Sequence, residues 1–173
     1  KNASSVRNHI DQYVLARLQD AKLVPAAAAS KSALIRRTTL DITGLPPTLA
    51  EVKTFLDDKS PDAFEKLIDR LLSSPRYGEH MARYWLDAVR YGDTHGLHLD
   101  KYREFYPYRD WVVRAFNRDL PYNQFVKAQI AGDLSGVVED KIATGFFAVG
   151  PTYTSDGGDP ESKAQAEAET LSD

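Results

Sequence analysis

The 173-residue chain contains no cysteine, one methionine and only a small excess of negative charge. Without cysteine it forms no disulfide, no thiolate nucleophile, no cysteine-ligated zinc site and no covalent bond to haem. A net charge of −3 provides no basic surface for phosphate groups, so we expect no nucleic-acid partner. No apolar run approaches the ~18 residues of a membrane span, and no stretch has the pattern of a signal peptide.

The remaining composition is that of one globular domain. Apolar residues make up 42% and charged residues 27% of the chain, and a chain of 173 residues can bury most of the apolar surface that unfolding exposes. We therefore predict a single domain over residues 1–173. Because the sequence begins at Lys1 rather than at methionine, we expect a truncated or processed part of a larger protein.

Apolar residues recur three and four positions apart along most of the chain, a spacing typical of amphipathic helices. Capping residues mark several helix starts: Ser30, Thr48 with Glu51, Ser60-Pro61 and Ser74-Pro75. The predicted helices cover residues 6–21, 30–42, 48–57, 60–72 and 74–89, with two more beginning near 106 and 120. Residues 139–147 fit either a short helix or a strand. We predict an all-α fold, a single multi-helix domain with long functional loops and at most two short strands.

The segment from Gly92 to Asp100 is the strongest candidate for a functional site. It contains two of the four histidines and two aspartates, directly after a predicted helix. Imidazole and carboxylate groups bind metals and transfer protons, and a loop allows such side chains to converge. We predict Asp93, His95 and His98 as catalytic residues, and these three with Asp100 as ligands of a divalent metal. Imidazoles favour zinc, iron or copper, whereas oxygen ligands alone favour calcium.

A purely structural interpretation of this loop stays open. Two histidines separated by two residues are a weak metal signature, and each imidazole can instead cap a helix end or hydrogen-bond a carboxylate. A second acidic segment is equally ambiguous, because Asp156, Asp159 and Glu161, beside two glycines, fit either a second metal-binding loop or a solvated turn. This segment lacks the complete ligand pattern of a helix-loop-helix calcium site.

Aromatic and arginine side chains near the histidine loop are candidates for substrate contacts. Tyr102 and Tyr106 could stack on sugar rings, while Arg90 and Arg103 could orient carboxylates or bind an anionic sugar. For the arginines, ion pairing with nearby aspartate and glutamate is the alternative. Both tryptophans fall on apolar helix stripes, so we expect them in the core.

Several blocks of the sequence, in their order, resemble a known family. They include Arg36-Arg37-Thr38-Thr39-Leu40-Asp41-Ile42-Thr43-Gly44-Leu45-Pro46-Pro47, Leu71-Leu72-Ser73-Ser74-Pro75-Arg76-Tyr77-Gly78-Glu79, Tyr108-Arg109-Asp110-Trp111-Val112 and Gln129-Ile130-Ala131-Gly132-Asp133-Leu134. Over nearly its whole length the chain resembles the uncharacterised domain that accompanies a planctomycete-type cytochrome c domain in large secreted proteins. The family name describes its neighbours and not a reaction.

The resemblance implies export to the periplasm or the cell exterior, a setting of polysaccharide degradation and a cytochrome c-type partner domain. Family members usually continue with a Cys-x-x-Cys-His segment, which has the spacing that attaches haem. This sequence stops at Asp173 before such a segment, so the resemblance implies a haem supplied by the absent remainder of the chain. Many relatives differ at the histidine loop, and the resemblance does not assign a metal to the family at large.

Three functions are compatible with these observations. The leading expectation is an exported module of a cytochrome-associated oxidoreductase acting on carbohydrate, in which the histidine loop binds metal or transfers protons. The alternatives are a non-catalytic carbohydrate-binding or scaffold module, and a metal-assisted glycan hydrolase whose histidines activate water. Redox turnover favours the first, glycan binding without turnover the second, and metal-dependent product release without an electron acceptor the third.

Overall fold

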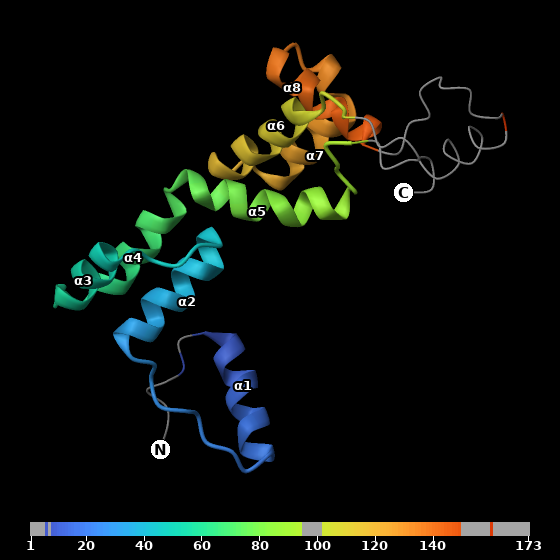
Figure 1. Cartoon of the computed structure of the whole chain (residues 1–173). Coiled ribbons are helices and arrows are strands. Elements are labelled where there is room, and N and C mark those ends of the chain that lie inside the picture. The colour runs from blue at the N-terminus through green and yellow to red at the C-terminus, as the bar shows by residue number, and fades with distance from the viewer. Residues whose placement is uncertain (1–5, 7, 95–101, 150–159, 161–173) are drawn as a thin grey trace.

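The computed structural model describes residue 6, residues 8–94, residues 102–149 and residue 160, and within these residues the fold is all-α (Figure 1). This confirms the predicted fold class. The helices are α1 (His9–Asp20), α2 (Lys31–Thr43), α3 (Leu49–Asp57), α4 (Ala63–Leu72), α5 (Pro75–Ala88), α6 (Tyr106–Asn117), α7 (Tyr122–Ala131) and α8 (Val138–Ala143), with 3₁₀ segments η2 (Gly132–Leu134) and η3 (Thr144–Ala148). An isolated antiparallel bridge joins Thr94 to Tyr102.

Side-chain caps begin three of the helices where the sequence marks them. Ser30 accepts a hydrogen bond from the backbone N–H of Ala33 at 3.2 Å. Thr48 and Glu51 form a reciprocal capping box, and Ser74 caps α5 ahead of a proline in its first turn. Each cap is worth about 1 kcal/mol, because it satisfies an amide group that has no partner within the helix.

The start of α4 differs from its prediction. This helix begins at Ala63 with Asp62 as its N-cap residue, two positions after the Ser60-Pro61 pair. Ser60 instead donates its hydroxyl and its backbone N–H to Asp58 Oδ1, at 2.6 and 2.8 Å. These bonds form a local turn that offers the backbone an alternative to the helix, and α4 begins after it.

The segment that the sequence left between helix and strand is helical and forms α8 and η3. Its position depends on a close backbone approach to Gly132. A Cβ atom at Gly132 would lie 2.0 Å from the backbone oxygen of Asp140, closer than any real contact. The missing side chain therefore lets α8 pack directly against η2.

Buried side chains form two separate clusters along the chain. The α2–α4 cluster consists of Ile35, Phe55, Ala63, Leu67 and Leu71. The α5–α8 cluster consists of Ala82, Tyr108, Trp111, Val112, Ala115, Phe125, Ala128, Ala143 and Val149. The first is mostly aliphatic, whereas the second contains three large aromatic side chains.

Helix α5 connects the two clusters, since it packs against both α2 and α6 (Figure 1). Gly78 allows the approach of α6, because a Cβ at this position would lie 2.5 Å from the backbone oxygen of Val113. The side chain of Asn117 completes the contact by accepting from Gly78 N at 2.8 Å and donating to the carbonyl of Pro75 at 3.1 Å. The N-terminal turn of α5 is thus hydrogen-bonded to the end of α6.

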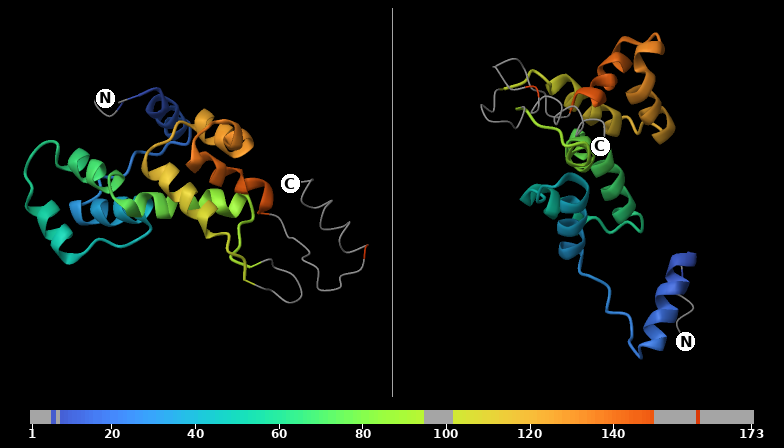
Figure 2. Two further views of the ribbon diagram at one scale, coloured as in Figure 1. Left: turned by 90° about the horizontal axis from the view of Figure 1, so that it is seen from above. Right: turned by 90° about the vertical axis from the view of Figure 1, so that its right-hand side faces the viewer.

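Helix α1 stands apart from the other helices in Figures 1 and 2. None of its residues is buried, and Ile10, Tyr13 and Val14 expose more than half of their surface. Residues 23–30 connect it to α2 without helical structure. The predicted amphipathic helix exists, but its apolar face contributes to neither cluster.

Candidate functional site

The chain leaves α5 toward the histidine loop through a tight turn at Arg90. This residue adopts the left-handed conformation, with φ of 55°, and the next amide, Tyr91 N, donates to Leu86 O at 2.8 Å. This arrangement is the Schellman motif, which usually places glycine at the left-handed position. The turn directs the chain away from the helix axis and fixes the start of the loop.

The two ends of the loop are held side by side by backbone contacts. Thr94 pairs with Tyr102 in the antiparallel bridge, and Arg103 N donates to Asp93 O at 2.8 Å. We call this pair of chain ends, residues 91–94 and 102–105, the loop neck. Three predicted site residues, His95, His98 and Asp100, lie outside the described residues.

Asp93 is the predicted catalytic residue that the structure places. Its Oδ1 accepts a hydrogen bond from the Tyr91 hydroxyl at 2.8 Å and lies 3.6 Å from Arg109 Nη1. Arg109 also pairs with Asp110, at 3.1 Å. Just over half of the Asp93 side chain stays exposed, at 56%. Its carboxylate is therefore oriented by two neighbours and open to solvent at the same time.

Burial, reinforced by the hydrogen bond to the Asp93 carboxylate, raises the pKa of Tyr91 to about 12. Both causes favour the protonated phenol, because ionisation would place a second negative charge beside the aspartate. Tyr91 consequently remains a hydrogen-bond donor throughout the physiological pH range. Its hydrogen bond holds the Asp93 carboxylate in position, so Tyr91 acts as a positioning residue.

Aromatic rings of the loop neck pack against the α5–α8 cluster. Tyr91 stacks on Phe105 with ring centroids 6.1 Å apart, and Phe105 lies 5.9 Å from Tyr108. The Tyr108 hydroxyl donates to Gln129 Oε1 at 2.7 Å. Trp85 Nε1 donates to the Tyr108 hydroxyl oxygen and to Gln129 Oε1, each at 3.1 Å. Aromatic contacts and a buried hydrogen-bonded triad thus connect the neck to the core.

Sequence reasoning missed this triad. Gln129 is almost completely buried, although glutamine is usually a surface residue. The available signal was its position on the apolar face of α7, four residues after Phe125, whose carbonyl accepts from Gln129 Nε2 at 3.2 Å. The expectation that both tryptophans lie in the core is accurate for Trp111, whereas Trp85 is partly buried.

Arg103 connects the loop neck to the end of η3. Its guanidinium lies 5.0 Å from the centre of the Phe105 ring, and its Nη2 donates to the backbone carbonyl of Ala148. The described chain thus reaches residue 149 immediately beside the neck. The second predicted acidic segment follows in sequence, and its residues Asp156, Asp159 and Glu161 lie outside the described residues.

The remaining predicted contact residues are open to solvent. Tyr102 exposes 65% and Tyr106 exposes 46% of its surface, and Arg90 is also exposed. Their rings and guanidinium group are accessible at or next to the neck. Among the residues that the structure describes, no three histidine, aspartate or glutamate side chains lie close enough together to hold a metal ion.

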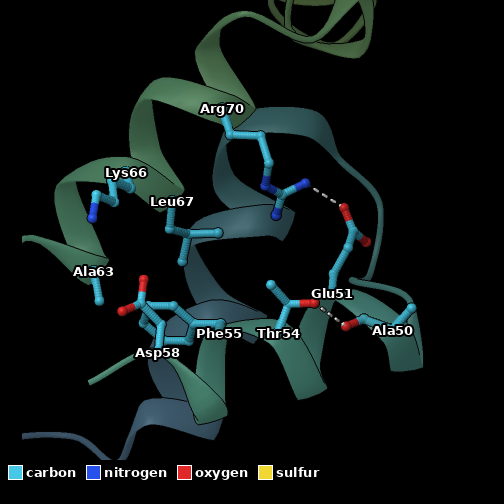
Figure 3. Close-up of a pocket in the computed structure, with 9 residues that line it drawn as sticks. All are labelled: Ala50, Glu51, Thr54, Phe55, Asp58, Ala63, Lys66, Leu67 and Arg70. Carbon is cyan, nitrogen blue, oxygen red and sulfur yellow. Dashed lines mark hydrogen bonds and ion pairs between the residues drawn. The ribbon is translucent and has the colours of Figure 1, made fainter. Parts of the chain in front are cut away.

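A concave surface that sequence reasoning missed lies between α3 and α4, away from the loop neck in sequence (Figure 3). Its volume is about 330 Å³, and its apolar floor is formed by Phe55, Ala63 and Leu67. The Arg70 guanidinium crosses the top of this groove and reaches Glu51 at 2.5 Å. A backbone hydrogen bond from Thr48, together with Arg70, lowers the pKa of Glu51.

The charged side chains of this α3–α4 groove have partners within the protein. Lys66 pairs with Asp62 at 3.0 Å, and Asp58 accepts two hydrogen bonds from Ser60. Of the charged contacts in this groove, the Arg70–Glu51 pair connects α3 to α4, and the other two are local. We therefore assign the groove a structural role and place the functional candidate at the loop neck.

Over residues 9–173 the chain matches the protein family PSCyt2, whose description is a protein of unknown function (DUF1549). This match confirms the resemblance to the cytochrome-associated family inferred from the sequence blocks. No curated protein and no solved structure matches the chain significantly. None of the helices in the described part of the chain has the length and apolar character needed to span a bilayer.

Proposed function

The chain belongs to the PSCyt2 family, and from this membership and the loop neck we propose that it is an exported, carbohydrate-facing module of a cytochrome-associated oxidoreductase. The family name supports an association with a cytochrome. In this proposal the module binds the sugar and removes its hydroxyl proton. A cytochrome c-type domain accepts the electrons.

The observation that carries the proposal is the hydrogen bond from Arg103 to Ala148. It places the end of η3 beside the loop neck, so the two polar segments of the sequence depart from neighbouring points of the fold. We propose that imidazoles of the 95–101 segment and carboxylates of the 150–161 segment serve one site. A shared site would explain why Arg103 and Ala148, which flank two segments of the sequence rich in metal-binding groups, are hydrogen-bonded to each other.

Oxidation of a sugar alcohol to a carbonyl releases two protons and two electrons. A histidine from the loop, His95 or His98, would accept the hydroxyl proton as a general base. Asp93, oriented by Tyr91 and Arg109, would then stabilise the resulting imidazolium or bind a sugar hydroxyl. The hydrogen on carbon would leave as the second proton, to the other histidine or to solvent. The two electrons would pass one at a time to a haem on the cytochrome domain, since this chain has no cysteine with which to attach a haem.

A second candidate function is carbohydrate binding without catalysis. The exposure of Tyr102 and Tyr106 favours it, because tyrosine rings next to a fixed loop neck can stack on sugar faces without any reaction. The two functions share a ligand class and differ in turnover.

The test uses the full-length native protein with sugar oligomers and an added electron acceptor. We expect acceptor-dependent turnover in the wild type, and loss of general base catalysis in His95→Ala or His98→Ala should reduce it about 100-fold or more. His9→Ala, on the exposed helix α1, is the matched control and should retain turnover.

Sugar affinity, measured in parallel by calorimetry, separates the two functions. Glycan binding without turnover in the wild type would replace the oxidoreductase with the binding module. Unchanged turnover in both histidine variants, with folding intact, would remove the loop from the reaction. Metal analysis of the same samples shows whether the two imidazoles also hold a metal ion.

A further inference from the structure

A groove of about 370 Å³ lies where α5, the end of α6 and the start of α7 meet. Its lining includes Tyr77, Trp85, Phe116, Tyr122 and Phe125, together with Asp119. Its described lining contains none of the predicted site residues, and no sequence motif identified it. Its lining combines aromatic rings with a single carboxylate.

The aromatic walls are held in place by packing and hydrogen bonds. Phe125 makes an edge-to-face contact with Trp85 at a centroid distance of 4.9 Å and lies 5.9 Å from Phe116. Trp85 Nε1 is committed to Tyr108 and Gln129, which fixes the orientation of the indole ring. A ligand entering this groove would therefore meet the rings of Trp85, Phe116 and Phe125 already ordered, which lowers the entropic cost of binding.

Asp119 is the one charged residue in the groove lining. It occupies the left-handed position of the turn after α6, with φ of 49°, and its N–H donates to Phe116 O at 3.1 Å. The turn fixes the backbone from which the carboxylate projects. Within the part of the chain that the structure describes, no hydrogen bond or ion pair engages this exposed carboxylate, and no basic residue lines the groove.

We propose that this groove binds a quaternary ammonium group. The faces of tyrosine and tryptophan rings attract organic cations, and one carboxylate complements one positive charge. A quaternary ammonium carries no N–H donor, so the apolar lining leaves none of its groups without a hydrogen bond. A sugar has several hydroxyls to satisfy, and the Trp85 N–H is already used within the protein.

The test titrates the folded chain with choline and with 3,3-dimethylbutan-1-ol, which has the same shape and no charge. Binding is followed by calorimetry and by tryptophan fluorescence. We expect choline to bind about tenfold more tightly than the neutral alcohol, within the range of a desolvated cation–aromatic contact. Asp119→Asn removes the complementary negative charge, so it should weaken choline binding while leaving that of the neutral alcohol unchanged. Asparagine tolerates the left-handed conformation, so the turn is preserved.

The matched control is Asp133→Asn, which removes an exposed carboxylate from η2, outside the groove lining. It should bind choline like the wild type. A trimethyllysine dipeptide, titrated in parallel, identifies whether the ammonium is better recognised as a free molecule or on a peptide.

Three results would overturn the proposal: equal affinity for the neutral alcohol, choline binding that Asp119→Asn leaves unchanged, or no choline binding by a folded chain. Tighter binding of sugar oligomers than of choline in this groove would assign it to carbohydrate instead. None of these outcomes depends on redox turnover, so the proposal can fail or succeed independently of the oxidoreductase function.

Discussion

The α2–α4 cluster and the α5–α8 cluster are stabilised in different ways. In the first, aliphatic side chains pack around Phe55, and an ion pair between Glu51 and Arg70 connects α3 to α4 at the surface. In the second, aromatic rings stack around Trp111, and the buried Gln129 joins a hydrogen-bonded triad. Aliphatic packing tolerates small changes of shape, whereas rings and buried polar groups require defined positions. The region that carries both proposed sites is the one with the stricter geometry.

The largest expected effect comes from removing the central ring of the α5–α8 cluster. Trp111 is fully buried and stacks on Phe125 at 5.2 Å, so Trp111→Ala should lower the free energy of unfolding by about 4 kcal/mol. Leu67→Ala, in the centre of the α2–α4 cluster, should lower it by about 3 kcal/mol. Urea denaturation measures both values.

The milder pair Leu67→Val and Trp111→Phe tests whether the clusters are independent. Because these side chains belong to different clusters, the two losses should add to within about 0.5 kcal/mol. Trp111→Phe also removes a buried indole N–H that has no hydrogen-bond partner among the described residues, which offsets part of the lost packing. A larger coupling energy would show that α5 transmits strain between the clusters.

The buried triad is expected to give the next largest effect. Gln129→Leu leaves the Tyr108 hydroxyl without its acceptor, and it removes one of two acceptors of Trp85 Nε1. An unsatisfied buried group costs about 2 kcal/mol, so unfolding in urea should shift by that amount. Gln124→Leu, at an exposed position of the same helix, is the control and should change stability by less than about 0.5 kcal/mol. Equal effects of the two variants would contradict the role of the triad.

The sequence predicted the features that depend on neighbours along the chain. The caps at Thr48 and Ser74 are local patterns, and both are present. The cap predicted at Ser60 is wrong, because Ser60 belongs to a local turn with Asp58 and α4 begins only after Asp62. Periodic apolar residues identified the helices, but periodicity alone could not show that α1 remains outside both clusters.

The candidate site could be located from the sequence but not assembled. The local density of histidine and aspartate identified the α5–α6 connection, where the structure orients Asp93 through Tyr91 and Arg109. The contact of Arg103 with Ala148 joins residues 45 positions apart, and no local pattern encodes such a pairing. The groove around Asp119 was missed for the same reason, since its walls come from three helices.

The ion pair of the α2–α4 region should contribute a small, pH-dependent stabilisation. The pKa of Glu51 is lowered in the folded state, so its contribution is complete above the ordinary pKa near 4.5 and is lost as the pH falls through the lower, folded-state pKa. Both partners are partly exposed, and screening limits the effect of Glu51→Gln to less than about 1 kcal/mol at pH 7. Urea unfolding at pH 7 and pH 3 measures it, with Glu65→Gln as an exposed control on α4. A difference that persists at low pH would mean that packing, and not charge, is responsible.

The smallest expected effect separates stability from binding within the α5–α8 region. Asp119 pays a conformational cost at φ of 49°, which glycine does not. Asp119→Gly should therefore raise the free energy of unfolding by about 0.5 kcal/mol, after the greater freedom of glycine in the unfolded chain is deducted. Lys22→Gly, at the equivalent left-handed position after α1, is the matched control, and it follows a helix without buried residues. If Asp119→Gly gains stability while its affinity for choline falls, the carboxylate is retained for binding at the expense of the fold. If the free energy of unfolding falls instead, the Asp119 side chain stabilises the turn. The presence of this carboxylate would then be explained by the fold and would not support a ligand-binding role.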